Sequence, residues 1–123
     1  MINKITPNIF QLYFKNFGST VYLIKLKEKN ILIDTSSKDN EKELIQNLKE
    51  LSLEPKNINT IILTHNHWDH VGNNKIFQNA KILDYKNKQE IETILPQSKV
   101  IDAKGHTQTD ICILYENILF SGM

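Results

Sequence analysis

Histidine and aspartate side chains are concentrated in one short segment of the chain. Three of the four histidines fall within six residues, as His65-x-His67-x-Asp69-His70, and the fourth is His106 in a Gly-His-Thr sequence. Imidazole and carboxylate groups are good ligands for Zn²⁺, and three histidines with one open position for water are typical of a catalytic zinc site. The pattern predicts a metal centre that activates water for hydrolysis. A polar loop whose histidines only hydrogen-bond to their neighbours is the alternative interpretation.

The spacing of these residues indicates how they could share metals. In an extended or tightly turned loop, side chains at positions i and i+2 project to the same side, so His65 and His67 can bind one metal. His106 would complete a set of three histidines. Asp69 and His70 can turn toward a second metal, at the separation of about 3.5 to 4 Å that is typical of two-metal hydrolases.

A predicted alternation of strands and helices positions the histidine segment. The segment follows directly after an Ile-rich run at 59–63 that is typical of a buried strand. Further strands are expected at 9–14, 20–26, 31–33, 81–84, 100–101, 111–115 and 118–120, and helices at 41–51, 72–77 and 87–95. This order predicts a layered α/β (α+β) domain with a mixed sheet, which ends in a hairpin with a Glu116-Asn117 turn.

Composition excludes several classes of protein. The chain has 123 residues, 40% of them hydrophobic and 24% charged, which predicts a single small globular domain. Its formal net charge is +1 and every basic residue is lysine, which argues against a nucleic-acid partner and favours a small-molecule substrate. A single cysteine excludes an internal disulfide, and no leader-like or membrane-spanning stretch is present, so we expect a cytoplasmic protein without a membrane partner.

Four stretches resemble the metallo-β-lactamase fold superfamily. Residues 64–72 are similar to its Thr-His-X-His-X-Asp-His-X-Gly signature, and Leu-Ile-Asp-Thr at 32–35, Lys-Gly-His-Thr at 104–107 and Leu-Phe-Ser-Gly at 119–122 follow the family's order. The resemblance implies that His65, His67 and His106 bind a first metal. It implies that Asp69 and His70 bind a second one, and that Asp69 orients or deprotonates the water.

The same resemblance assigns supporting roles to two residues. Asp34 and Thr107 correspond to family residues that would fix the orientation of the imidazole ligands, a support that metal sites generally require. For Asp34 alone, a turn or helix-start residue is an equally good interpretation.

The chain also departs from the family pattern. Met123 stands where the family has an aspartate that bridges both metals. The resemblance covers only the first half of the αββα sandwich. We therefore expect 1–123 to be a single half domain, with one mixed β-sheet covered by helices on one face. Three arrangements then compete: a separate polypeptide supplies the second half, two copies form a homodimer, or the chain is a truncated remnant.

The resemblance implies a zinc-dependent hydrolase that acts on a small ester, thioester or lactone. We expect about one Zn²⁺ per chain with a weak second site, and iron or manganese as alternative metals. The rival hypothesis is a non-catalytic zinc-binding interaction domain or a degenerate remnant of such a hydrolase.

Overall fold

The computed structural model describes residues 1–66, 68–103 and 110–121, and residues 68 and 69 by their backbone alone. Its larger sheet has six strands in the order β1-β2-β3-β4-β5-β6. The strands are β1 (Ile2–Thr6), β2 (Ile9–Leu12), β3 (Val21–Lys25), β4 (Asn30–Ile33), β5 (Thr60–Ile62) and β6 (Lys81–Leu83). Strands β1 to β4 pair antiparallel, whereas β4, β5 and β6 are parallel, so the predicted mixed sheet is confirmed.

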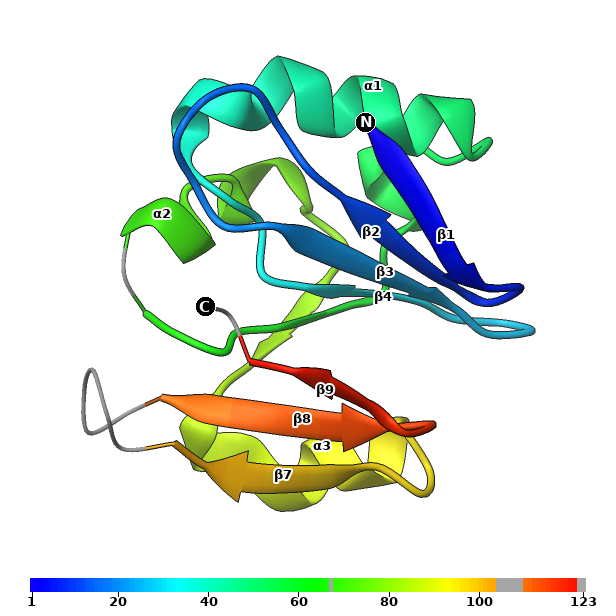
Figure 1. Cartoon of the computed structure of the whole chain (residues 1–123), viewed down its shortest axis with the longest axis vertical. Helices are drawn as coiled ribbons and strands as arrows, with labels where there is room; N and C mark the ends of the chain where they lie inside the picture. The colour runs from blue at the N-terminus through cyan, green and yellow to red at the C-terminus, as the bar shows by residue number, and fades with distance from the viewer. Residues whose placement is uncertain (67, 104–109, 122–123) are drawn as a thin grey trace.

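Two helices connect the parallel strands, and a third leads from β6 to the second sheet. They are α1 (Glu41–Glu50), α2 (Trp68–Val71) and α3 (Lys88–Ile94), with short 3₁₀ turns η1 (Lys38–Asn40), η2 (Pro55–Asn57), η3 (Asn74–Ile76) and η4 (Tyr85–Asn87). Helix α1 lies on the outer face of the six-stranded sheet (Figure 1) and buries Leu44 and Leu48 against it. Along the described backbone, no helix is long and apolar enough to cross a membrane.

A second, smaller sheet covers the other face of the first one. It consists of β7 (Lys99–Asp102), β8 (Ile111–Tyr115) and β9 (Ile118–Phe120), all antiparallel. Figure 1 shows the three layers in the order α1, six-stranded sheet, three-stranded sheet. The expected α/β layering is confirmed, but the face opposite α1, for which the sequence predicts no covering layer, carries this second sheet and also α3, whose Ile91 packs in the same core.

The two faces of the large sheet are buried in two separate cores. Side chains alternate along a strand, so Leu32 of β4 packs toward α1 while Ile31 and Ile33 pack toward the small sheet. Phe120 of β9 packs in the second core. Its ring contacts the ring of Tyr22 edge-on, with the two ring centroids 4.9 Å apart. Because both faces are covered, the central strands are continuous apolar runs.

Three local features differ from the sequence-based expectations or refine them. Strand β1 was not predicted, since its residues are mostly exposed and show no apolar alternation. The histidine segment, expected to be a loop throughout, becomes helical at α2, and the helix expected at 72–77 is reduced to the 3₁₀ turn η3. The Glu116-Asn117 turn is confirmed, and both residues have the positive φ (52° and 66°) that a tight hairpin turn requires.

Candidate metal centre

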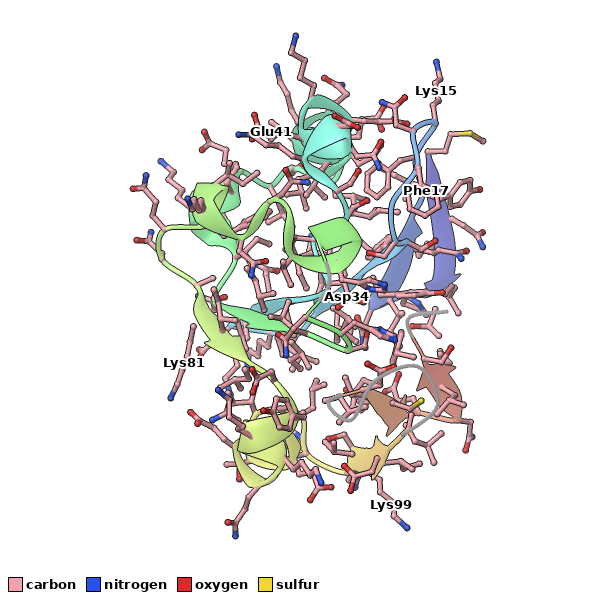
Figure 2. All side chains as sticks on the ribbon, turned by 90° about the vertical axis from the view of Figure 1, so that its left-hand side faces the viewer. Lys15, Phe17, Asp34, Glu41, Lys81 and Lys99 are labelled. Carbon is pink, nitrogen blue, oxygen red and sulfur yellow. The ribbon has the colours of Figure 1, made fainter. Side chains whose placement is uncertain are left out.

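The candidate site lies where two parallel strands end at the same edge of the large sheet. Asp34 directly follows β4, and Thr64 and His65 follow β5 after one intervening residue. The Asp34 amide donates to the Ile62 carbonyl oxygen (2.8 Å), so strand pairing continues to the first residue of the site. Figure 2 looks onto this edge and labels Asp34 there. Ligand sites of open α/β sheets characteristically lie at this carboxyl edge.

Asp34 organises the site through both of its carboxylate oxygens. Its Oδ1 accepts the Thr64 amide (2.8 Å), and its Oδ2 accepts the Thr64 hydroxyl (2.6 Å) and lies 3.1 Å from His70 Nδ1. The residue is 1% exposed and has φ +66°, a left-handed conformation that aspartate tolerates better than most residues. One carboxylate thus contacts both Thr64 and His70, and the supporting role of Asp34 stays a prediction.

Two of the predicted ligands, His65 and His70, are brought together. Their rings are buried, with centroids 4.4 Å apart and planes inclined by 34°. His70 is on α2, whose backbone is tied to the loop after β4 because the Thr35 amide donates to the His70 carbonyl oxygen (2.8 Å). The structure therefore places these two histidines side by side, and the assignment of each to a metal stays a prediction.

The hydrogen bonds of the two rings define their tautomers. The Thr64 hydroxyl donates to Asp34 Oδ2, and because a carboxylate oxygen accepts, we assign the proton of the His70 ring to Nδ1, which faces the same oxygen. The Thr64 oxygen is then the acceptor for His65 Nδ1, 3.1 Å away. In the neutral form of each ring this assignment places the lone pair on Nε2.

A second carboxylate, which the sequence analysis did not single out, lies beside His65. Asp110 Oδ2 is 3.0 Å from His65 Nε2, and both side chains are almost fully buried. Two backbone hydrogen bonds place Asp110 there: the Ile111 amide donates to the Thr64 carbonyl oxygen (3.0 Å), and the Ala103 amide donates to the Asp110 carbonyl oxygen (2.9 Å). The only signal in the sequence was an acidic residue four positions after His106.

A buried polar layer, also missed by the sequence analysis, supports the site from behind. The Asn73 side-chain amide donates to the carbonyl oxygens of Thr35 (2.7 Å) and Ser37 (2.8 Å), and the Thr35 hydroxyl donates to Asn74 Oδ1 (2.8 Å). The Gly72 amide donates to the Ser36 carbonyl oxygen (2.9 Å). These bonds fix the end of α2 against the loop that carries Asp34.

The remaining predicted site residues lie outside the described part of the chain. These are His67, His106 and Thr107, together with the side chain of Asp69. Within the described side chains, no group of three or more His, Cys, Asp or Glu is arranged to hold a metal. The donor types that the structure does bring together, imidazole nitrogen and carboxylate oxygen, fit zinc, iron or manganese.

The charge of Asp110 also affects the pKa of the single cysteine, Cys112. Burial and, as the smaller cause, the Asp110 carboxylate raise the pKa of the Cys112 thiol above its ordinary value. Cys112 is half-buried on β8, and its side chain shares the outer face of the small sheet with the exposed residues Ile101, Leu114 and Leu119.

Comparison with known proteins agrees with this fold. Residues 15–121 match the sequence profile of the metallo-beta-lactamase superfamily. A protein described as a probable metallo-hydrolase of Methanocaldococcus jannaschii is 34% identical in an alignment of 105 residues that covers 75% of this chain and 49% of that protein. The chain spans less than half the length of each curated relative that it matches.

Solved structures show the same arrangement at lower sequence identity. A Thermotoga maritima protein assigned to the metallo-beta-lactamases superposes with a TM-score of 0.75 at 21% identity, over 89% of this chain and 72% of that one. A flavo di-iron protein of Thermotoga maritima superposes with a TM-score of 0.74 at 21% identity, over 98% of this chain and 41% of that one. At these identities, the likeness establishes the fold alone.

Proposed function

Because the chain belongs to the metallo-beta-lactamase superfamily, we propose that it carries the metal-binding part of a zinc-dependent hydrolase for a small ester, thioester or lactone. Superfamily membership supports a metallo-hydrolase function at the coarse level, and the substrate class and the metal are the proposed refinements. The observation that carries the proposal is the pair of buried rings of His65 and His70, each held through Nδ1 with its centroid 4.4 Å from the other. Such orientation of imidazoles is what a ligand set needs.

The proposed ligands divide between the described and undescribed parts of the chain. His65 and His70 would each present Nε2, and His67, His106 and the Asp69 carboxylate would complete the set. Zn²⁺ bound there would supply Lewis acidity that activates a water molecule and polarises the substrate carbonyl. Asp34 and Thr64 keep the two rings in one tautomer and one orientation, and Asp69 would hold or accept the proton of the attacking water.

The test combines metal content with turnover. The purified chain is loaded with Zn²⁺, its metal is counted by native mass spectrometry, and hydrolysis of p-nitrophenyl acetate, a thioester and a lactone is measured. We expect Asp69→Asn to retain the fold and the metal bound by His65, His67 and His106 but to lose turnover about 100-fold or more, because it removes the proton acceptor. A wild-type chain whose hydrolysis of all three substrates stays at the level of His65→Ala would refute the catalytic proposal.

The same preparation distinguishes the hydrolase from the rival function, a non-catalytic zinc-binding interaction domain. A structural metal contributes folding free energy, so a chelator should unfold a zinc-stabilised interaction domain. Zinc binding with chelator-induced unfolding and without turnover would therefore favour the non-catalytic domain. A chain that binds no Zn²⁺ would favour the degenerate remnant.

The partner and the location stay predictions. A homodimer, or a separate polypeptide that supplies the second half, is expected from the sequence. Native mass spectrometry of the chain with and without metal measures the dimer directly. The half-domain organisation of 1–123, the single zinc per chain and the cytoplasmic location likewise await measurement.

A further inference from the structure

The contact between His65 and Asp110 poses a problem of charge. Because the Thr64 hydroxyl donates to Asp34 (2.6 Å), we assign its oxygen as the acceptor for His65 Nδ1 (3.1 Å), which places the lone pair of a neutral ring on Nε2. That nitrogen faces the Asp110 Oδ2 atom at 3.0 Å. A lone pair and a carboxylate oxygen at this distance repel each other. The contact between His65 and Asp110 therefore requires a positive charge, either a cation bound by both atoms or a proton on the ring.

Asp34, Thr64, His65 and Asp110 form a continuous series of polar contacts. Starting from β4, the Asp34 carboxylate accepts the Thr64 hydroxyl (2.6 Å), the Thr64 oxygen faces His65 Nδ1 (3.1 Å), and His65 Nε2 faces Asp110 (3.0 Å). Every group in this series is almost fully buried. A buried carboxylate is costly unless it is paired or coordinates a metal.

We propose that Asp110 is an additional ligand of the metal bound by His65. Zinc bonds to imidazole nitrogen and to carboxylate oxygen are each about 2.0 to 2.2 Å long, so one cation can bind two atoms that lie 3.0 Å apart. The backbone supports this role, because the hydrogen bonds of Ile111 and Ala103 fix the position of Asp110 at the start of β8. The inference rests on the proposed function in one respect, namely that the site binds a metal.

The alternative is that Asp110 only pairs with a protonated His65 ring. The two roles predict opposite effects on metal affinity. If Asp110 is a ligand, its loss removes a bond to the metal and lowers affinity. If Asp110 only pairs with the ring, it competes with the metal for His65, and its loss leaves affinity unchanged or raises it.

The experiment compares Asp110→Asn with the wild-type chain. Asparagine keeps the size of the side chain but removes its charge. Zn²⁺ affinity is measured by competition with a chromophoric chelator, and Co²⁺ is substituted to record its visible d–d spectrum. We expect Asp110→Asn to weaken Zn²⁺ binding at least 10-fold and to alter the Co²⁺ spectrum, because the ligand set changes. Asp102→Asn, on an exposed carboxylate at the end of β7, is the matched control and should change neither quantity.

Each outcome decides the inference. Unchanged or tighter Zn²⁺ binding by folded Asp110→Asn, with an unchanged Co²⁺ spectrum, would overturn it while leaving the metal site intact. A wild-type chain that binds neither metal would overturn the proposed function as well. Circular dichroism establishes that the variant is folded. If Asp110→Asn does not fold, Asp110→Ser is measured with the same expected loss of affinity.

Discussion

Gly72 approaches the backbone of Lys38 so closely that a Cβ atom on Gly72 would lie 2.5 Å from the Lys38 nitrogen. The same Cβ would be 2.9 Å from the Ser36 carbonyl oxygen. These neighbours are backbone atoms, which cannot move aside as the end of a flexible side chain can. The residue after α2 is therefore glycine because the loop that follows β4 leaves no space for a side chain.

We expect Gly72→Ala to destabilise the fold by about 1–3 kcal/mol, the usual cost of inserting a methyl group into a closely packed site. The loss should appear as a lower midpoint in urea denaturation of the metal-free chain. Gln78→Ala, at an exposed loop position, is the control and should change stability little. A Gly72→Ala chain as stable as the wild type would contradict the close approach.

Asp34→Asn should weaken both the fold and the metal site. The amide can accept through only one atom, whereas the carboxylate accepts from the Thr64 amide and the Thr64 hydroxyl and faces His70. With at least one buried donor left without a partner, we expect a loss of about 2–3 kcal/mol in the free energy of unfolding. Zn²⁺ affinity should fall about 10- to 100-fold as the His70 ring loses its orientation. Asp39→Asn changes an exposed carboxylate at η1 and should leave both measurements unchanged.

The Thr64 hydroxyl should be required for full stability and Zn²⁺ affinity, whereas the Thr64 methyl group should not. Thr64→Val removes the hydroxyl that donates to Asp34 and accepts from His65, so it should cost about 1–3 kcal/mol of stability and about 10-fold in Zn²⁺ affinity. Thr64→Ser keeps the hydroxyl and should restore most of the Zn²⁺ affinity. Equal Zn²⁺ affinity in the valine and serine variants would show that the hydroxyl does not orient the ring.

Local sequence patterns predicted most of the fold. Apolar runs such as that at 31–33 belong to strands buried on both faces, and their side chains are apolar enough to be recognised without the rest of the chain. Strand β1 escaped prediction because an exposed edge strand needs no apolar alternation. The cover provided by β7–β9 depends on contacts between the two sheets, which no short window of sequence contains.

Sequence patterns likewise indicated some residues of the candidate site and missed others. The spacing of His65 and His70 was visible in the sequence, and the structure places their ring centroids 4.4 Å apart, while their roles as metal ligands stay predictions. Asp110 could not be found by spacing, because it meets His65 only through a hydrogen bond between strand ends that are more than forty positions apart, from Ile111 to Thr64. The polar support from Asn73 was missed for the same reason, since its partners lie on the loop after β4.

The single thiol should react slowly, and its reactivity should report the charge of Asp110. Burial and then Asp110 raise the pKa of Cys112, so less thiolate is present at pH 8 than for an ordinary cysteine, and the thiolate is the form that alkylates. In the metal-free chain, we expect the rate of iodoacetamide labelling to rise with pH through a midpoint above 9.0, the usual value. Asp110→Asn removes the negative charge and should lower this midpoint, whereas Asp102→Asn should not. Because Cys112 is the only cysteine, mass spectrometry of the intact chain measures the rate directly. A midpoint at or below the usual value in the wild-type chain would show that neither burial nor Asp110 acts on the thiol as the structure indicates.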